Sequence, residues 1–219
     1  MTTEERFSHV IDWFRVNMPV AETELKHGDP YQLMVATILS AQCTDKRVNL
    51  ITPAFYARYP TVESLAAARR EDVFELVRSC SYPNNKTQHL IDASRKIVDD
   101  FDGHLPQEVE QLMTIPGIGR KTANVIAAVA FQKQALAVDT HVFRVSARIG
   151  LTKGARNPLE TEQQLTRHIP KDLHSIAHHW LILHGRYVCQ ARKPKCGECG
   201  LKEFCSYIEK TGVGLKAPV

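Results

Sequence analysis

Residues 115–121 read Ile115-Pro116-Gly117-Ile118-Gly119-Arg120-Lys121 and lie between two stretches of helical periodicity. Two glycines in a Gly-x-Gly pattern permit a tight turn whose backbone N–H groups point outward. The helix that follows adds the positive end of its dipole, so the turn suits an anion such as a phosphate, with Arg120 beside it. A plain helix-to-helix turn, in which the glycines serve geometry alone, would show the same letters.

Outward from this turn, most of the chain has helical periodicity. Asp29-Pro30 places a capping residue before a proline at the first helical position. Asn157-Pro158-Leu159-Glu160 repeats this device with a capping-box Glu. Alternating strand patterns are nearly absent, so the sequence predicts an all-α fold with short connections. Helices that run from these two caps are expected, together with others at Glu5–Val16, Lys46–Tyr59, Val62–Ala68, Asp72–Ser79, Lys86–Phe101, Gln107–Thr114, Lys121–Phe131, His141–Ile149 and Leu173–Val188.

Four cysteines near the C-terminus have the spacing C-x6-C-x2-C-x5-C, namely Cys189, Cys196, Cys199 and Cys205. The cytosol disfavours disulfides, so thiols this close together predict a metal centre. Ligand type alone leaves zinc and an iron–sulfur cluster open, although zinc loops usually pair two C-x2-C units and only one is present. The isolated Cys43 and Cys80 are interpreted as small buried apolar side chains.

Length and composition fit a globular intracellular protein. A chain of 219 residues and 24.7 kDa can form one large domain or two small ones. The longest strongly apolar run, Val125 to Phe131, is too short to span a bilayer. The N-terminus lacks an apolar signal segment. We therefore expect a cytoplasmic protein with no membrane partner; the tail Thr211–Val219 has no motif that predicts a role.

Charge is divided unevenly along the chain. Residues 1–133 hold 15 Lys and Arg against 17 Asp and Glu, which gives −2, whereas residues 134–219 hold 13 against 7, which gives +6. The loop between the first two clustered cysteines contains Arg192, Lys193 and Lys195. A basic C-terminal third favours nucleic acid over membrane as a partner. A solubilising surface explains the charge about equally well.

Lys121 is a candidate nucleophile. A free lysine has a pKa near 10.4, so only about one in 2,500 is neutral at pH 7. A helix N-terminus contributes roughly 0.3–1 kcal/mol, less than one pKa unit, whereas burial can lower a lysine pKa by about 3–5 units. The hypothesis therefore predicts that Lys121 is desolvated and faces a cleft between domains. Most lysines in a first helical turn are solvated surface groups, which is the competing interpretation.

Asp139 lies in Ala137-Val138-Asp139-Thr140-His141-Val142, eighteen residues after Lys121. Aspartate is a favoured N-cap, and a helix is expected to start there. Its carboxylate could also accept a proton or stabilise positive charge on a sugar ring. Capping and catalysis are compatible at this position.

Taken together, these motifs resemble the endonuclease III branch of the helix-hairpin-helix DNA glycosylases. The resemblance covers nearly the whole chain, with the motifs in the family's order. It rests on four segments: Leu39-Ser40-Ala41-Gln42-Cys43-Thr44-Asp45, Ile115–Ala123, Val138–Arg144 and the four-cysteine loop.

The resemblance implies an all-α fold of two domains. Residues 23–133 would form a six-helix barrel domain that contains the hairpin. Residues 1–22 would join residues 134–219 in an iron–sulfur domain, with the active-site cleft between the two domains. The four cysteines would hold a structural [4Fe-4S] cluster, and Arg192, Lys193 and Lys195 would meet DNA phosphates.

The resemblance also implies a bifunctional base excision repair enzyme that acts as a monomer at the bacterial nucleoid. Its partner would be double-stranded DNA with an oxidised or ring-saturated pyrimidine or an abasic site. Lys121 would attack C1′ of the flipped nucleotide, and β-elimination through a Schiff base would cut the strand 3′ to the lesion. Asp139 would assist as a carboxylate. The DNA-contacting residues implied are Gln42, which fills the space of the flipped base, Asp45 and His141 in the pocket, and Gly117, Gly119 and Arg120 in the hairpin.

One segment departs from the family pattern. Ser81-Tyr82-Pro83-Asn84-Asn85-Lys86 stands where the family usually shows a Gly, then a residue that wedges into the duplex, then an aromatic residue. Tyr82 occupies the wedge position and can stack on bases at roughly 1–3 kcal/mol per contact. This departure leaves the preferred lesion and opposite base open.

Two rival functions share parts of this pattern. The adenine-glycosylase branch removes a base only, lacks the nucleophilic lysine and usually has an extra C-terminal domain. This chain has Lys121 and only 14 residues after Cys205, which favours the bifunctional enzyme. A non-catalytic helix-hairpin-helix module with a zinc knuckle is the other rival, and iron content and activity on abasic DNA would distinguish it.

Overall fold

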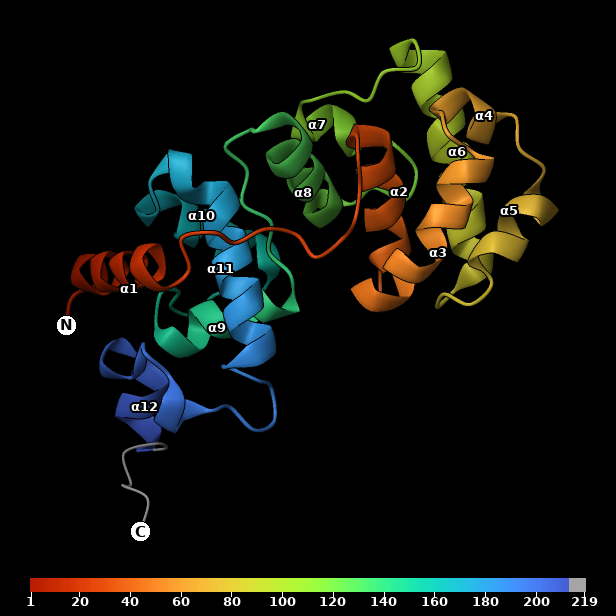
Figure 1. The fold of residues 1–219 in the computed structure, drawn as a ribbon. Helices are drawn as coiled ribbons and strands as arrows, with labels where there is room; N and C mark the ends of the chain where they lie inside the picture. The colour runs from red at the N-terminus through yellow and green to blue at the C-terminus, as the bar shows by residue number, and fades with distance from the viewer. Residues whose placement is uncertain (213–219) are drawn as a thin grey trace. The chain divides into compact units, whose positions relative to one another are not determined.

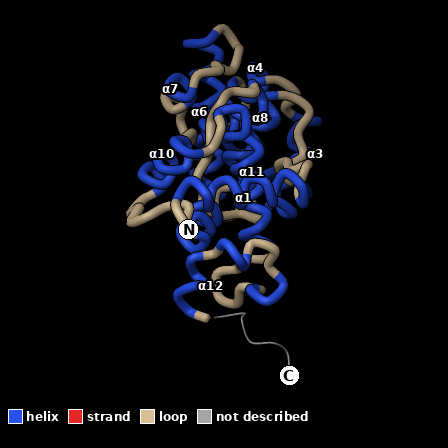
Figure 2. Tube along the Cα trace, turned by 90° about the vertical axis from the view of Figure 1, so that its left-hand side faces the viewer, coloured by secondary structure: helices blue, strands red, loops and turns tan. Residues whose placement is uncertain are grey.

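The computed structural model describes residues 1–212 of the chain, so residues 213–219 of the tail lie outside the described part. Its described residues form helices, turns and loops and contain no strand (Figures 1 and 2). The predicted all-α fold is confirmed. Across residues 1–212, no helix combines the length and the apolar character that crossing a membrane requires.

The chain divides into two compact units, Thr23–Lys133 and Met1–Glu22 with Gln134–Val219. The first unit is continuous in sequence and includes the hairpin. Its described helices are α2 (Pro30–Ser40), α3 (Asp45–Arg58), α4 (Val62–Ala66), α5 (Arg70–Val77), α6 (Pro83–Phe101), α7 (Val109–Leu112) and α8 (Arg120–Phe131).

Helix α2 is the centre of the Thr23–Lys133 unit. Every residue from Leu33 to Leu39 is buried, and α2 packs against α3, α6 and α8. Asp29 begins the helix as predicted, because its side chain accepts a hydrogen bond from the N–H of Gln32 at 2.8 Å and Pro30 follows it. Helix α8 buries Ala123 to Ala128, which leaves its first turn at the surface.

The second unit combines the N-terminal helix with the C-terminal third of the chain. Its described helices are α1 (Thr3–Asn17), α9 (Thr140–Ile149), α10 (Pro158–His168), η1 (Lys171–Leu173), α11 (His174–Tyr187), η2 (Cys196–Glu198), η3 (Lys202–Phe204) and α12 (Ser206–Thr211) (Figure 1). Three short 3-10 turns and α12 are additions to the helices that the sequence predicts.

Contacts between residues far apart in the chain hold α1 in this unit. Phe14 on α1 stacks on Trp180 of α11, with ring centroids 5.4 Å apart and planes inclined by 4°. The indole N–H of Trp180 donates to the carbonyl of Met18 at 2.7 Å. Both rings are almost fully buried, so their burial stabilises the packing of α1 on α11 by an estimated 1.5–3 kcal/mol for each side chain.

The predicted cap of α10 also forms, with one difference. Asn157 accepts a hydrogen bond from the N–H of Glu160 at 2.9 Å. The Glu160 carboxylate reaches back to the Asn157 side chain and to the N–H of Arg156, each at 2.8 Å. Asparagine has an amide donor of its own, so the glutamate satisfies that group in addition to a backbone N–H.

Candidate functional site

The hairpin is anchored by two isoleucines on either side of its turn. Ile115 and Ile118 are 2% and 4% exposed, and the N–H of Ile118 donates to the carbonyl of Ile115 at 3.1 Å. Pro116 and Gly117 occupy the two central positions of this turn, and Gly117 has a φ of 79°. A side chain at Gly117 would place its Cβ 2.7 Å from Cβ of His89 on α6. Only glycine therefore fits both the backbone and the packing.

Gly119 serves a different purpose. It is the N-cap of α8, with extended backbone at φ −85° and ψ 174°, which any residue adopts. Within residues 1–212, no side chain caps this helix end, and apart from the adjoining residues no atom lies within 4 Å of the position a Cβ would take. Geometry alone thus explains Gly117 but not Gly119, whose missing side chain leaves open space at a positive helix end beside the exposed Arg120.

Lys121 lies in the first turn of α8 and is exposed. The prediction that Lys121 is desolvated is therefore wrong, whereas its position in a cleft between the domains stays a prediction. The reason is the register of α8, because its apolar stripe starts at Ala123 and the preceding turn points outward. The nucleophile hypothesis then requires that a bound substrate desolvates the Lys121 amine.

Asp139 is the N-cap of α9, as the sequence predicts. One carboxylate oxygen accepts hydrogen bonds from the N–H groups of His141 and Val142, both at 2.8 Å. The segment before it is fixed from α11, since a ring nitrogen of His178 lies 2.6 Å from the carbonyl of Ala137. The carboxylate is thus held in place and only half-buried, so it stays accessible to a ligand.

His141 follows Asp139 on α9 and is half-buried. Its Nδ1 lies 3.2 Å from a terminal nitrogen of Arg144, which also donates to the carbonyls of Gly185 at 3.0 Å and Cys189 at 3.2 Å. Because a guanidinium only donates, it favours the tautomer of His141 in which Nδ1 accepts. This arrangement connects the start of α9 to the cysteine loop.

The three remaining DNA-contacting candidates of the Thr23–Lys133 unit lie at the ends of helices. Gln42 follows α2, is exposed and has a φ of 53°. Asp45 is the first residue of α3 and is half-buried. Tyr82 is the N-cap of α6, is 61% exposed and has a φ of 52°. A bulky residue with positive φ is an outlier, and such residues cluster at functional sites.

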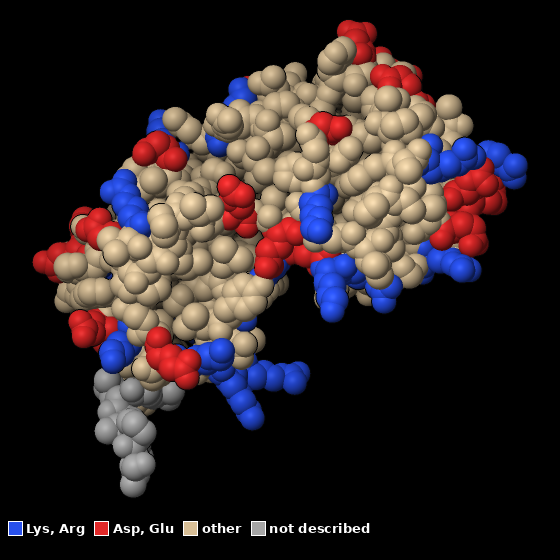
Figure 3. Space-filling model, in the orientation of Figure 1, with Lys and Arg blue, Asp and Glu red and all other residues tan. Residues whose placement is uncertain are grey.

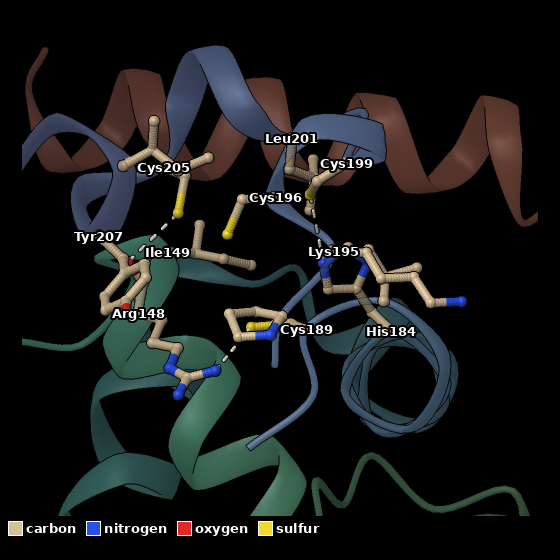
Figure 4. A pocket seen from close by; sticks show the side chains of 13 residues that line it. Arg148, Ile149, His184, Cys189, Lys195, Cys196, Cys199, Leu201, Cys205 and Tyr207 are labelled. Carbon is tan, nitrogen blue, oxygen red and sulfur yellow. Dashed lines mark hydrogen bonds between the residues drawn. The ribbon is translucent and has the colours of Figure 1, made fainter. Parts of the chain in front are cut away.

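The four predicted ligand cysteines line one pocket, with Ile149, Leu201 and Ile208 among its apolar walls (Figure 4). All four are free thiols. Cys196, Cys199 and Cys205 are at most 9% exposed, whereas Cys189 is half-buried. Burial raises the pKa of Cys199 to about 11 and also raises the pKa of Cys196 and Cys205. Thiolates there need a bound metal cation to compensate for lost hydration.

The donor set of this pocket, four cysteine thiols, fits an iron–sulfur cluster. Tetrahedral zinc requires sulfurs about 3.8 Å apart, from Zn–S bonds of about 2.3 Å. Among the described residues, no three His, Cys, Asp or Glu side chains converge closely enough for a single ion. The residues present therefore fit a cluster.

Arg148 on α9 is a residue of this pocket that the sequence interpretation missed. Its guanidinium donates to the carbonyls of Gln190 and Ala191 at 2.7 and 2.8 Å. It lies 3.6 Å from Sγ of Cys189 (Figure 4). It also lies over the ring of Tyr207, 5.1 Å from the centroid. Arg144 and Arg148 are four residues apart and therefore lie on the same face of a helix. This spacing was the sequence signal that could have identified Arg148.

His184 was missed as well. It is 3% exposed, and its Nε2 lies 3.6 Å from Sγ of Cys199 (Figure 4). The three predicted basic residues of the loop, Arg192, Lys193 and Lys195, are all exposed. Figure 3 shows Lys and Arg side chains that project from the surface at the loop after α11. The four pocket cysteines and the basic residues therefore lie in the same short segment of the chain.

Comparison with known proteins identifies the family. Residues 35–171 match the family model described as HhH-GPD superfamily base excision DNA repair protein, and residues 189–205 match the iron–sulfur binding domain of endonuclease III. The chain is 47% identical to an endonuclease III of Synechocystis sp. over 92% of both chains. The chain belongs to the endonuclease III family. The endonuclease III of Escherichia coli is 37% identical over 93% of this chain and 96% of that protein.

Solved structures agree with this assignment. The chain superposes with a TM-score of 0.91 and 38% identity on "Structure of a Trapped Endonuclease III-DNA Covalent Intermediate: Estranged-Adenine Complex", over 96% of this chain and 99% of that one. A non-covalent endonuclease III–DNA complex gives the same TM-score and identity. A thermostable thymine-DNA glycosylase shares the fold, with a TM-score of 0.83. Membership of the endonuclease III family confirms the predicted enzyme class, DNA as partner and the iron–sulfur cofactor.

Proposed function

We propose that this endonuclease III family member removes oxidised or ring-saturated pyrimidines from duplex DNA and then cuts the abasic strand by β-elimination. The observation that carries the proposal is the position of Lys121, an exposed residue in the first turn of α8 directly after the hairpin. A structural relative of this chain has been solved as a trapped covalent intermediate with DNA, which supports covalent chemistry here.

The chemistry starts from the neutral amine of Lys121. Its nitrogen forms a bond to C1′ of the damaged nucleotide, and the glycosidic bond breaks with its electron pair on the departing base, which takes up a proton. Opening of the sugar ring gives an iminium between C1′ and Nζ. Loss of a C2′ proton then expels the 3′ phosphate by breaking the C3′–O3′ bond. Water hydrolyses the imine and releases Lys121.

Two features would make this amine reactive. The sugar and flipped base of bound DNA would displace water from Lys121, and this desolvation would lower its pKa against the opposing effect of the nearby phosphates. Asp139 would accept a proton or stabilise positive charge on the sugar, because its carboxylate is held by two N–H groups at 2.8 Å and remains half-buried. Both features would act only when a nucleotide is bound.

We also propose how the chain holds DNA. A phosphate would lie against the open space at Gly119 and the start of α8, with Gly117 setting the turn and Arg120 beside it. Gln42 and Tyr82 would enter the duplex at the flipped nucleotide, and the base would meet Asp45 and His141. Arg192, Lys193 and Lys195 would contact phosphates further along.

Cys189, Cys196, Cys199 and Cys205 would hold the [4Fe-4S] cluster, which cross-links the loop when bound. In this proposal Thr23–Lys133 is the helix-hairpin-helix domain and the other unit is the iron–sulfur domain. The protein would act as a monomer in the cytoplasm, at the nucleoid. Metal analysis of purified protein should give about four iron atoms per chain and no zinc.

Borohydride trapping on a duplex with an abasic site tests the chemistry. Wild type should form a covalent adduct, and Lys121→Ala should form none. Lys121→Arg is the matched control, since a guanidinium keeps the positive charge but is never neutral in a protein. It should bind the duplex like wild type without forming the adduct. An adduct with Lys121→Ala would assign the nucleophile to another residue.

A further inference from the structure

Tyr82 and Gln42 both have left-handed backbone. Gln42 lies just after a helix, where this conformation is common, whereas Tyr82 lies at the start of one, where it is not. Across residues 1–212, four non-glycine residues have positive φ, and two of these, Asp102 and Gln132, are ordinary helix C-caps. Gln42 follows the C-cap of α2 in a similar way. Tyr82 is instead an N-cap, a position that is normally extended. Such a conformation persists only when the surroundings fix it.

The hydroxyl of Ser81 supplies part of that fixation. It donates a 2.7 Å hydrogen bond to the carbonyl of Gln42, thirty-nine residues earlier in the chain. The same oxygen accepts a hydrogen bond from Nζ of Lys86 at 3.1 Å. A single oxygen thus connects the loop after α2 with the loop before α6, next to Gln42 and Tyr82, the two residues with positive φ. A glycine or alanine at this position could make neither bond.

Lys86 fixes the other side of this connection. Although a lysine, it is only 4% exposed, and its Nζ donates to the carbonyl of Leu39 in the last turn of α2 at 2.8 Å. A cation is favoured there by the negative end of the helix dipole. Burial lowers the pKa of Lys86, because the charged amine loses hydration there. Despite this unfavourable desolvation, the amine donates hydrogen bonds to both loops.

We propose that Ser81 and Lys86 are positioning residues that hold Gln42 and Tyr82 at a fixed spacing, so that the two exposed side chains enter the duplex together. This inference rests on the proposed function, in which Gln42 and Tyr82 contact DNA. It also gives a use for Ser81 at a position where the family resemblance leads one to expect glycine. The serine hydroxyl compensates for a tyrosine wedge whose backbone conformation is costly.

Ser81→Ala is the test variant and Ser64→Ala its matched control. The Ser64 hydroxyl also makes one donated and one accepted hydrogen bond in the same unit, to the carbonyl of Thr61 at 2.7 Å and from its N–H at 3.2 Å. Both substitutions should lower the thermal midpoint by a similar small amount. Only Ser81→Ala should slow single-turnover base removal from a duplex, by about 3- to 10-fold, the size of one lost hydrogen bond.

A second substrate distinguishes a positioning role of Ser81 from a general loss of protein folding or activity. Borohydride trapping on a single-stranded abasic oligonucleotide needs neither base flipping nor a duplex, so Ser81→Ala should match wild type there. Ser81→Thr, which keeps a hydroxyl, should restore duplex activity to within about 2-fold. If wild type removes no base, the proposed function fails. If wild type is active and Ser81→Ala is as fast, or no slower than Ser64→Ala, this inference alone is overturned.

A double-mutant cycle supplies an independent readout. If Ser81 acts through Tyr82, the loss caused by Ser81→Ala should shrink when Tyr82→Ala is already present, because the side chain to be positioned is gone. Fluorescence of 2-aminopurine next to the lesion would report base flipping directly and should fall with Ser81→Ala. Strictly additive losses in the cycle would contradict a positioning role.

Discussion

Arg148 donates a 2.7 Å hydrogen bond to the carbonyl oxygen of Gln190, forty-two residues later in the chain. This bond links α9, the helix that Asp139 caps, to the loop that carries both the cluster ligands and the basic residues. The same guanidinium holds Ala191 and covers the ring of Tyr207. One side chain thereby fixes the shape of a loop that has little regular structure of its own.

Arg148→Met should therefore loosen the basic loop. We expect a loss of stability of about 1–3 kcal/mol, since hydrogen bonds to a charged group are broken in a half-buried setting. Duplex affinity and iron retention should fall as well, as measured by fluorescence anisotropy and metal analysis. Arg167→Met removes an exposed arginine from α10 and is the control. Equal effects of the two substitutions would exclude a special role for Arg148.

The two hairpin glycines should respond differently to alanine. Gly117→Ala combines a positive φ with a Cβ 2.7 Å from His89, so stability should fall by about 2–4 kcal/mol. Gly119→Ala meets no atom within 4 Å and should cost at most about 1 kcal/mol as a poorer N-cap. Its methyl group would occupy the proposed phosphate space, so duplex affinity should still fall. Thermal melts and anisotropy measure the two effects, and unchanged affinity of Gly119→Ala would remove the phosphate from this position.

Asp139→Asn separates the cap from the charge. Asparagine caps helices as well as aspartate does, so the thermal midpoint should stay near that of wild type. Base removal should slow by about 100-fold or more, the usual contribution of a positioned acid or base. Asp139→Ala should in addition lose about 1 kcal/mol of stability, because the two 2.8 Å hydrogen bonds to N–H groups disappear. Wild-type turnover in the asparagine variant would leave Asp139 as a cap only.

Cys80 should react slowly with alkylating reagents in the folded protein. Burial, with the neighbouring Cys43 as a smaller cause, raises the pKa of Cys80 from its ordinary value of 9.0 to about 11. Only the thiolate reacts, so alkylation at pH 8 should be much slower in the folded protein than in urea. The protonated thiol contributes stability below pH 9, and this contribution is lost as pH rises through 11. Mass spectrometry of alkylated peptides checks the rate, and equal rates in both states would contradict burial.

Much of the fold follows from local sequence. Asp29 and Asn157 begin helices because a short polar side chain satisfies nearby N–H groups, and this depends on a few neighbouring residues only. Gly117 is required by a turn of four residues. The four clustered cysteines likewise predict a metal centre from spacing alone. Each of these features depends only on residues that lie close together in the sequence.

Contacts between distant segments were not predictable in this way. Helix α12 is six residues long, too short to be stable by itself, and an ion pair of Glu209 with Arg6 at 3.1 Å helps to hold it. The hydrogen bond from Ser81 to Gln42 is equally non-local. No periodicity in the sequence marks such pairs, because they form only after the helices between them have packed.

The sequence by itself therefore predicted the longer helices, the turn of the hairpin and the cysteine loop that belongs to an iron–sulfur domain. Only the tertiary structure decided the surroundings of those residues. Lys121 shows the difference, because its position after the hairpin is fixed by the chain whereas its exposure depends on how α8 packs. The hydration and pKa of a side chain, and the shape of a loop, depend on which residues surround them in the folded protein. Those surroundings are set by packing between distant segments.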